Sequence, residues 1–157
     1  MLLTRKQLHL NHFDYSDPSS VFFITICTNN KKPYFRNPDI VSSILSEIDF
    51  RANASREVAI FAYCIMPDHL HFLLKLRETY GKTLQNWVAA FKRYTAGDIN
   101  EEFRIKPLWQ KNFYEHIVRK DESLEKITEY IVNNPVRKGL VGDWRKYPYS
   151  KIDFTDF

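Results

Sequence analysis

The stretch "EVAIFAYCIMPDHLHFLLKL", residues 57–76, decides the fold. Two apolar runs rich in β-branched and aromatic residues, 57–66 and 69–76, are separated only by Pro67 and Asp68. Runs of this composition are typical of strands, and so short a connection predicts a hairpin. The sequence therefore places an antiparallel strand pair at the centre of the chain.

Two histidines, His69 and His71, lie one residue apart in the second strand. Since strand side chains alternate between the faces of a sheet, both imidazoles should share one face with Leu73 and Lys75. The opposite face would carry Leu70, Phe72 and Leu74. Imidazole binds divalent ions, so the pair predicts the beginning of a metal site, although an ordinary polar sheet face explains it about as well. Cys64 precedes the turn and is expected to lie away from the histidines.

Four further segments complete the predicted sheet and its helices. "VFFITICT" (21–28) and "LWQKNFYEHIVR" (108–119) read as strands, whereas "NPDIVSSILSEID" (37–49) and "TLQNWVAAFKRYTAGDI" (83–99) show helical spacing of apolar residues. The order β-α-β-β-α-β predicts an α+β, ferredoxin-like (RRM-like) fold, with an antiparallel sheet and two helices on one face. The other face stays open for a ligand or a further helix.

A last helix is predicted in "DESLEKITEYIVNNP", residues 121–135, where Pro135 ends the element. At helical spacing, Lys126, Tyr130 and Asn134 align along one flank. A tyrosine hydroxyl and a carboxamide would then face the same way. Taken singly, Tyr130 also fits a half-buried packing role, and Lys126 fits a solvated helix lysine.

The composition of the chain limits the number of domains and the kinds of partner to expect. The 157 residues carry a net charge of +4, with a sequence pI near 9.0 and 44% hydrophobic residues, which predicts one globular domain over residues 1–157. Basic pairs along the chain favour a phosphate-bearing partner if they converge in space. No window resembles a membrane span, and Cys27 and Cys64 are too few for a disulfide framework. We therefore expect a cytoplasmic protein without a membrane partner.

Several motifs in a fixed order resemble one family. They are "YSDPSSVFFITICTNNKKPYF", "YCIMPDHLHFLL", "FKRYT", "PLWQKNFYEHIVRKDESLEKITEYIVNNPVRKGLV" and "YPYS". Together they are similar to the HUH-type single-tyrosine transposases, with the REP-associated tyrosine transposases as the nearest branch, over almost the whole chain. The resemblance implies an antiparallel sheet that carries the histidine pair and a C-terminal helix that carries the catalytic tyrosine.

The resemblance also implies roles for individual residues. Tyr130 matches the nucleophile, and His69, His71 and Asn134 match the ligands of a divalent metal, Mg²⁺ or Mn²⁺. Asp68 stands where the family more often has Asn. The implied activity is metal-dependent cleavage and rejoining of single-stranded DNA at hairpin-containing repeats, through a 5′-phosphotyrosine intermediate. Lys126 is a weaker candidate for catalytic support.

Basic and aromatic residues are the predicted DNA contacts, since they bind phosphates and stack on bases. They are Lys92, Arg93, Tyr94, Lys31, Lys32, Arg5 and Lys6. Whether the protein acts as a monomer or a homodimer stays open. Two other functions stay open as well: a non-catalytic DNA-binding module or domesticated repressor on the same fold, and a metal-dependent enzyme that acts on a small molecule.

Overall fold

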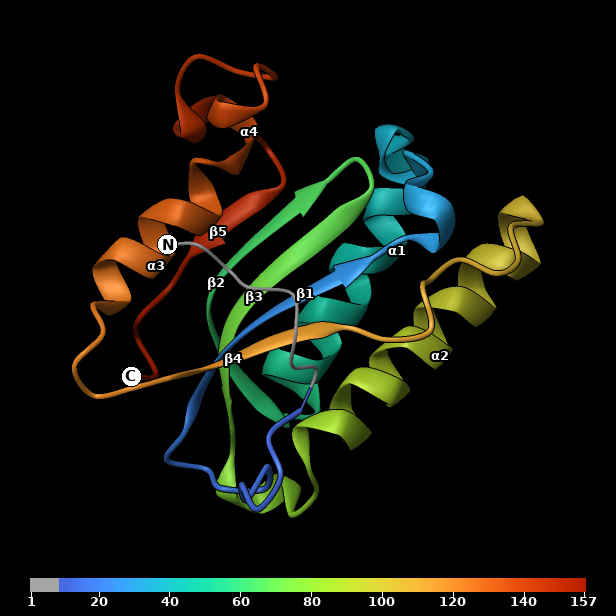
Figure 1. Cartoon of the computed structure of the whole chain (residues 1–157). Helices are drawn as coiled ribbons and strands as arrows, with labels where there is room; N and C mark the ends of the chain where they lie inside the picture. Colours follow the sequence, from blue (N-terminus) through green and yellow to red (C-terminus); the bar gives the residue numbers. More distant parts are fainter. Residues whose placement is uncertain (1–8) are drawn as a thin grey trace.

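The structure, a computed structural model, describes residues 9–157 and contains one sheet with helices on both faces (Figure 1). The strands are β1 (Val21–Cys27), β2 (Val58–Met66), β3 (His69–Leu76), β4 (Tyr114–Val118) and β5 (Ser150–Ile152). The α-helices are α1 (Pro38–Asp49), α2 (Leu84–Phe103), α3 (Leu124–Val132) and α4 (Asn134–Arg137). Within the described residues, no helix has the length and apolar composition that a membrane crossing requires.

The strands are ordered β4-β1-β3-β2-β5, and every neighbouring pair is antiparallel. The first four strands have the predicted ferredoxin-like arrangement, which confirms the fold class. The additional strand β5 was not predicted, because its three residues pair only with the outer edge of β2 and carry no apolar run. Strand β4 is shorter than the predicted 108–119, since only Tyr114–Val118 pairs with β1.

Helices α1 and α2 cover one face of the sheet and form the larger core. As predicted, Leu70, Phe72 and Leu74 of β3 point into this core, where Phe72 packs edge-to-face on Trp87 and Phe91 of α2. Helix α3 packs on the other face, over a smaller cluster that includes Phe23, Leu73 and Ile131. Alternation along β3 therefore places Leu70, Phe72 and Leu74 in the larger core and the histidines on the opposite face, together with Leu73.

The last predicted helix is divided in two. Helix α3 begins at the cap of Ser123, whose hydroxyl accepts from the backbone N–H of Lys126, and ends at Val132. Asn134 opens the short helix α4, with Pro135 in its first turn. A proline has no N–H to donate and restricts the residue before it, so a continuous helix through residue 134 is disfavoured. Tyr130 and Asn134 consequently lie on two consecutive helices.

Candidate active site

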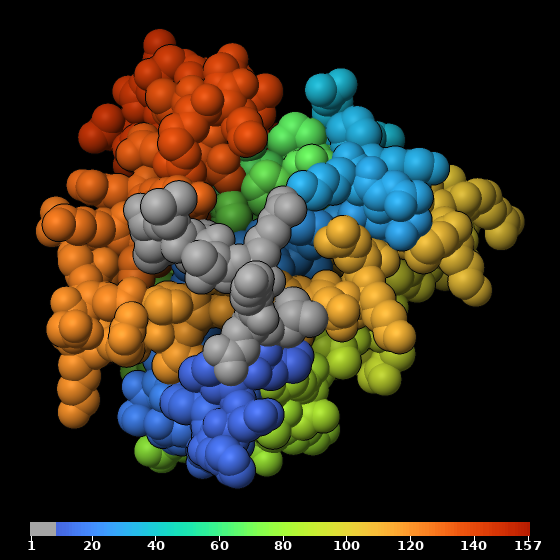
Figure 2. All heavy atoms as spheres, in the orientation of Figure 1, coloured from blue at the N-terminus to red at the C-terminus, as the bar shows by residue number. Residues whose placement is uncertain are grey.

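A pocket of about 620 Å³ opens beside the β2–β3 turn, on the sheet face that α1 and α2 leave uncovered. His69 and His71 of β3, Tyr130 of α3 and Asn134 of α4 all line it. Figure 2 shows the green hairpin residues recessed between the orange-red C-terminal segment and the light-blue residues that follow β1. The structure thus brings together the four residues on which the sequence prediction of an active site depends.

His69 is oriented by its neighbours on both sides. The Asp68 carboxylate accepts a hydrogen bond of 2.6 Å from Nδ1, and Nε2 lies 3.1 Å from the side-chain amide of Asn134. A carboxylate only accepts, so the proton of a neutral His69 sits on Nδ1 and the lone pair on Nε2. Burial lowers the pKa of His69, although the hydrogen bond to Asp68 offsets part of that decrease.

His71 is the more deeply buried imidazole. Its Nδ1 lies 2.7 Å from the hydroxyl of Thr25, the residue paired with it across β1 and β3. Burial, followed by the neighbouring His69, lowers the pKa of His71 well below its usual range. The ring centroids of the two histidines are 4.8 Å apart, so two neutral imidazoles stand side by side.

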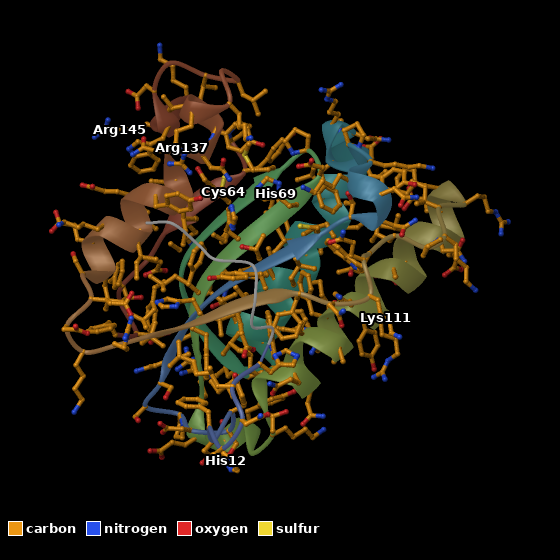
Figure 3. All side chains as sticks on the ribbon, viewed as in Figure 1. His12, Cys64, His69, Lys111, Arg137 and Arg145 are labelled. Atoms are coloured by element: carbon orange, nitrogen blue, oxygen red, sulfur yellow. The ribbon has the colours of Figure 1, made fainter. Side chains whose placement is uncertain are left out.

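The expected separation of Cys64 from the histidines is wrong. Cys64 pairs with His71 across β2 and β3, so both side chains emerge on the same face of the sheet, and Figure 3 labels Cys64 close to His69 in the same hairpin. Burial raises the pKa of the Cys64 thiol to about 12. The sulfur therefore stays protonated at neutral pH, whereas a metal binds the thiolate.

Tyr130 is held by contacts to its ring and to its backbone. Its ring centroid lies 6.1 Å from that of Phe23 and 6.3 Å from that of His71. The Arg137 guanidinium carbon lies 4.1 Å from the Tyr130 ring centroid, and Nη2 of Arg137 donates to the Tyr130 carbonyl at 2.8 Å. One arginine of α4 therefore stacks on the tyrosine of α3 and also bonds its main chain.

The donor set of this pocket fits a divalent cation. Two neutral imidazoles offer nitrogen lone pairs, and a 180° turn of the Asn134 carboxamide would bring its oxygen to the side of His69 Nε2. The hydrogen bond that Nδ1 of His69 donates to the Asp68 carboxylate is the kind of contact that usually orients a metal-binding histidine. Across residues 9–157, no three or more His, Cys, Asp or Glu side chains gather to hold a metal. The candidate set of metal ligands therefore needs the amide oxygen of Asn134 as its third member.

Cationic side chains surround the pocket, and the sequence indicated only part of this set. Lys31, which was predicted to bind DNA, lines the pocket together with Arg36 and Lys138. Lys138 and Lys31 are close enough to the histidines to contribute to the lowered pKa of His69. Lys138 belongs to one of the basic pairs of the sequence, Arg137 with Lys138, whereas Arg36 belongs to none of them. Only the folded chain gathers these side chains here.

Other predicted residues lie elsewhere. Lys32 and Lys126 are exposed and do not line the pocket, and Arg5 and Lys6 lie outside the described residues. Arg93 and Tyr94 are on the exposed side of α2, in the helix layer on the opposite face of the sheet. DNA contacts by all these residues stay predictions.

The fold and the pocket together define a class of protein. A tyrosine and two imidazoles on the open face of a ferredoxin-like sheet are the arrangement that the resemblance to tyrosine transposases implies. The chain belongs to the IS200-like transposase family, because the family model described as "Transposase IS200 like" matches residues 19–134. The matched range includes both histidines, Tyr130 and Asn134.

Individual relatives agree with this membership. A REP-associated tyrosine transposase of Escherichia coli (strain K12) is 24% identical over 136 residues, which cover 87% of this chain and 78% of the relative. An uncharacterized protein of Haemophilus influenzae is 29% identical over 162 residues, with 84% of this chain and 88% of the relative covered. The predicted resemblance to the REP-associated branch is confirmed.

Among solved structures, a REP-associated tyrosine transposase bound to a REP hairpin has a TM-score of 0.69 to this chain at 21% identity. The match covers 90% of this chain and 82% of that chain. At this identity the likeness confirms the fold.

Proposed function

We propose that this transposase is a metal-dependent single-stranded DNA endonuclease that cleaves and rejoins DNA at hairpin-containing repeats through a 5′-phosphotyrosine. The observation that carries the proposal is the shared pocket of Tyr130, His69, His71 and Asn134. A small-molecule enzyme would leave the tyrosine and the cationic rim without a role. Residues 1–157 would act as one catalytic domain.

Tyr130 is the proposed nucleophile. Its hydroxyl oxygen would form a bond to phosphorus while the bond from phosphorus to the 3′ oxygen breaks. The tyrosine gives up its proton, and the departing 3′ oxygen takes one up, which leaves a 3′-hydroxyl and a 5′-phosphotyrosine. The energy of the phosphodiester is kept in the new bond, so a second 3′-hydroxyl reverses the step and rejoins DNA.

His69, His71 and Asn134 are the proposed ligands of Mg²⁺ or Mn²⁺. When bound, such an ion supplies positive charge to the non-bridging oxygens of the reacting phosphate. Asp68 and Thr25 would orient the two imidazoles through their Nδ1 atoms, so that each Nε2 faces the pocket.

Arg137 and the cationic rim would place the DNA and the nucleophile. The guanidinium over the Tyr130 ring limits the rotation of that side chain. Lys31, Arg36 and Lys138 surround the pocket and would bind the phosphates on either side of the reacting one. The solved relative bound to a REP hairpin supports a hairpin as the DNA partner. A supporting role for Lys126, which is exposed on α3, stays a prediction.

The test looks for a covalent adduct between the protein and DNA. The protein is incubated with labelled single-stranded oligonucleotides that contain the hairpin repeats flanking its gene, with Mn²⁺ or Mg²⁺, and is run on a denaturing gel. We expect a labelled protein band that disappears in Tyr130→Phe and with excess chelator. Tight binding of the hairpins without adduct or cleavage with either ion would contradict the proposal and favour the non-catalytic binding module.

A further inference from the structure

The helix that carries Tyr130 is joined to the sheet by a short loop. Strand β4 ends at Val118, and α3 begins at Leu124 after the cap at Ser123. Figure 1 shows the chain leaving β4 and turning back into α3. The position of Tyr130 relative to the histidine pair therefore depends on how firmly this helix is held.

Apolar packing fixes only part of that position. Ile127 and Ile131 of α3 are buried in the same cluster as Phe23 and Leu73 of the sheet. Burial of apolar area is non-directional, so these contacts hold α3 against the sheet but resist a small rotation or a slide along its axis only weakly. Hydrogen bonds have preferred directions, and they are suited to fix the helix in these respects.

The C-terminal end of α3 has such bonds. Arg137 donates to the Tyr130 carbonyl at 2.8 Å, and the Asn134 amide, at the start of α4, lies 3.1 Å from Nε2 of His69. These contacts tie one end of the helix to α4 and to the histidine pair. A second attachment, at the other end, is needed to fix its direction across the sheet.

The N-terminal end of α3 is attached to β4 by His116 and Glu122. Because a carboxylate only accepts, Nε2 of His116 carries a proton and donates to the two oxygens of Glu122 at 2.7 and 3.0 Å. The same carboxylate accepts from the backbone N–H of Arg119 at 2.9 Å. Burial raises the pKa of Glu122, but the bonds from Arg119 and His116 outweigh it and lower the pKa, so the carboxylate is charged at neutral pH.

The register of the sheet connects this pair with the nucleophile. His116 pairs with Phe23 across β4 and β1, and Phe23 is the ring on which Tyr130 packs edge-on, with 6.1 Å between the centroids. Tyr114 lies two residues before His116, on the same face of β4. After burial, Tyr130 and Glu122 both contribute to the raised pKa of Tyr114. The pair and the nucleophile therefore share their neighbours on the sheet.

We propose that His116 and Glu122 are positioning residues that fix the N-terminal end of α3 and thereby hold Tyr130 in line with the reacting phosphate. The inference rests on the proposed function, because it takes Tyr130 as the nucleophile. Neither His116 nor Glu122 lines the active-site pocket, so both would act through α3. A displacement of about 1 Å can lower a rate about 100-fold, whereas the metal ligands and the cationic rim would be unchanged.

The test separates rate from affinity. Single-turnover adduct formation is measured with Mn²⁺ at saturating hairpin DNA, and Kd for the hairpin and for Mn²⁺ is measured in the Tyr130→Phe background. His116→Leu should slow adduct formation about tenfold and change either Kd less than about twofold. His116→Gln keeps an N–H donor close to the position of Nε2 and should recover most of the rate.

A double-mutant cycle tests whether the two residues act as one pair. Glu122→Ala should slow adduct formation as well, and the double variant His116→Leu/Glu122→Ala should be no slower than the slower single variant. Glu125→Ala is the matched control, since it removes an exposed carboxylate from the first turn of the same helix and should keep the full rate.

Three results would overturn the inference. The first is an unchanged rate in His116→Leu. The second is an equal loss of rate in Glu125→Ala, which would indicate an effect of charge at the start of the helix. The third is a loss of hairpin or Mn²⁺ affinity that matches the loss of rate, which would indicate general damage to the fold. If His116→Leu does not fold, Glu122→Ala and its control decide in its place.

Hydrogen exchange distinguishes this inference from the proposed function. The amides of residues 128–132 in the DNA-free protein report how firmly α3 is held, whether or not DNA is cleaved. They should exchange faster in His116→Leu, while those of β1 and β3 stay unchanged. If α3 loosens in this variant but no adduct forms even in the unsubstituted protein, cleavage is refuted and the pair remains an attachment of α3. If the adduct forms and exchange in α3 is the same in both proteins, only the positioning role is refuted.

Discussion

The two faces of the sheet differ in how completely they are covered. On one face, α1 and α2 bury long rows of aromatic and aliphatic side chains, including Trp87 and Phe91. On the other face, α3 covers only part of the sheet, and the uncovered remainder carries His69, His71 and Thr25 beside an open pocket. The site lies where packing is incomplete, because only there do polar side chains of the sheet reach a ligand.

The two faces also contribute differently to the stability of the protein. A side chain on the covered face contributes through the apolar area that it removes from water. The histidines on the open face are partly desolvated as well, but hydrogen bonds to Asp68 and Thr25 satisfy one nitrogen of each ring. Substitutions on the first face should therefore change stability, and substitutions on the second should mainly change function.

The largest effect is expected on the covered face. Phe91→Ala should lower the free energy of unfolding by about 3–5 kcal/mol, because the fully buried ring leaves a cavity next to Trp87 and Phe72. Chemical denaturation measures this change. Tyr94→Ala, on the exposed side of the same helix, is the control and should stay within about 0.5 kcal/mol of the unsubstituted protein. Similar losses for both variants would mean that the covered face is not the main source of stability.

A smaller, functional effect is expected at the edge of the pocket. Asp68→Ala should weaken Mn²⁺ binding about 10–100-fold, because His69 loses the carboxylate that orients its ring. Titration calorimetry on the Tyr130→Phe protein measures the affinity without DNA cleavage. Asp68→Asn keeps a hydrogen-bond acceptor at this position and should lose less Mn²⁺ affinity than Asp68→Ala. Unchanged Mn²⁺ affinity in Asp68→Ala would argue against His69 as a ligand.

A still smaller effect, on the rate of adduct formation, is expected from the contact between α3 and α4. Arg137→Leu should slow adduct formation about two- to fivefold, since a cation stacked on an aromatic ring near the surface is worth roughly 0.5–1 kcal/mol. Single-turnover rates at saturating DNA separate this effect from binding. Arg137→Lys keeps the charge and should recover part of the rate. A rate that is lost completely in both variants would indicate that Arg137 contacts the reacting phosphate itself.

The smallest effect concerns Tyr15, whose hydroxyl donates to the buried carboxylate of Glu115. Burial, followed by this hydrogen bond, raises the pKa of Tyr15 to about 12. Between pH 10 and 12 the unfolded chain loses this proton and the folded chain keeps it, so stability is lost as the pH rises. Tyr15→Phe should lower the free energy of unfolding by about 0.5–1 kcal/mol at neutral pH. Above pH 10, the free energies of unfolding of the variant and the unsubstituted protein should come closer together. Unfolding curves at several alkaline pH values test this; a constant difference would contradict it.

Much of the fold follows from local patterns. The two strands around Pro67 and Asp68 pair as the short turn requires, and alternation along β3 places His69 and His71 opposite the core. The same register also pairs residue 64 with residue 71. The wrong prediction for Cys64 was therefore avoidable, since counting across the turn would have placed it beside His71.

The sequence by itself determined the order of the main elements, the face of the sheet that carries the histidines, and the choice of Tyr130 and Asn134 as candidate site residues. Short-range spacing encodes these features, because strand and helix periods act over a few residues. The tertiary structure alone decided that Lys92 holds the 110–112 backbone and that Lys31, Arg36 and Lys138 meet at one pocket. Such contacts join residues far apart in the chain, and they depend on how helices, loops and sheet pack together.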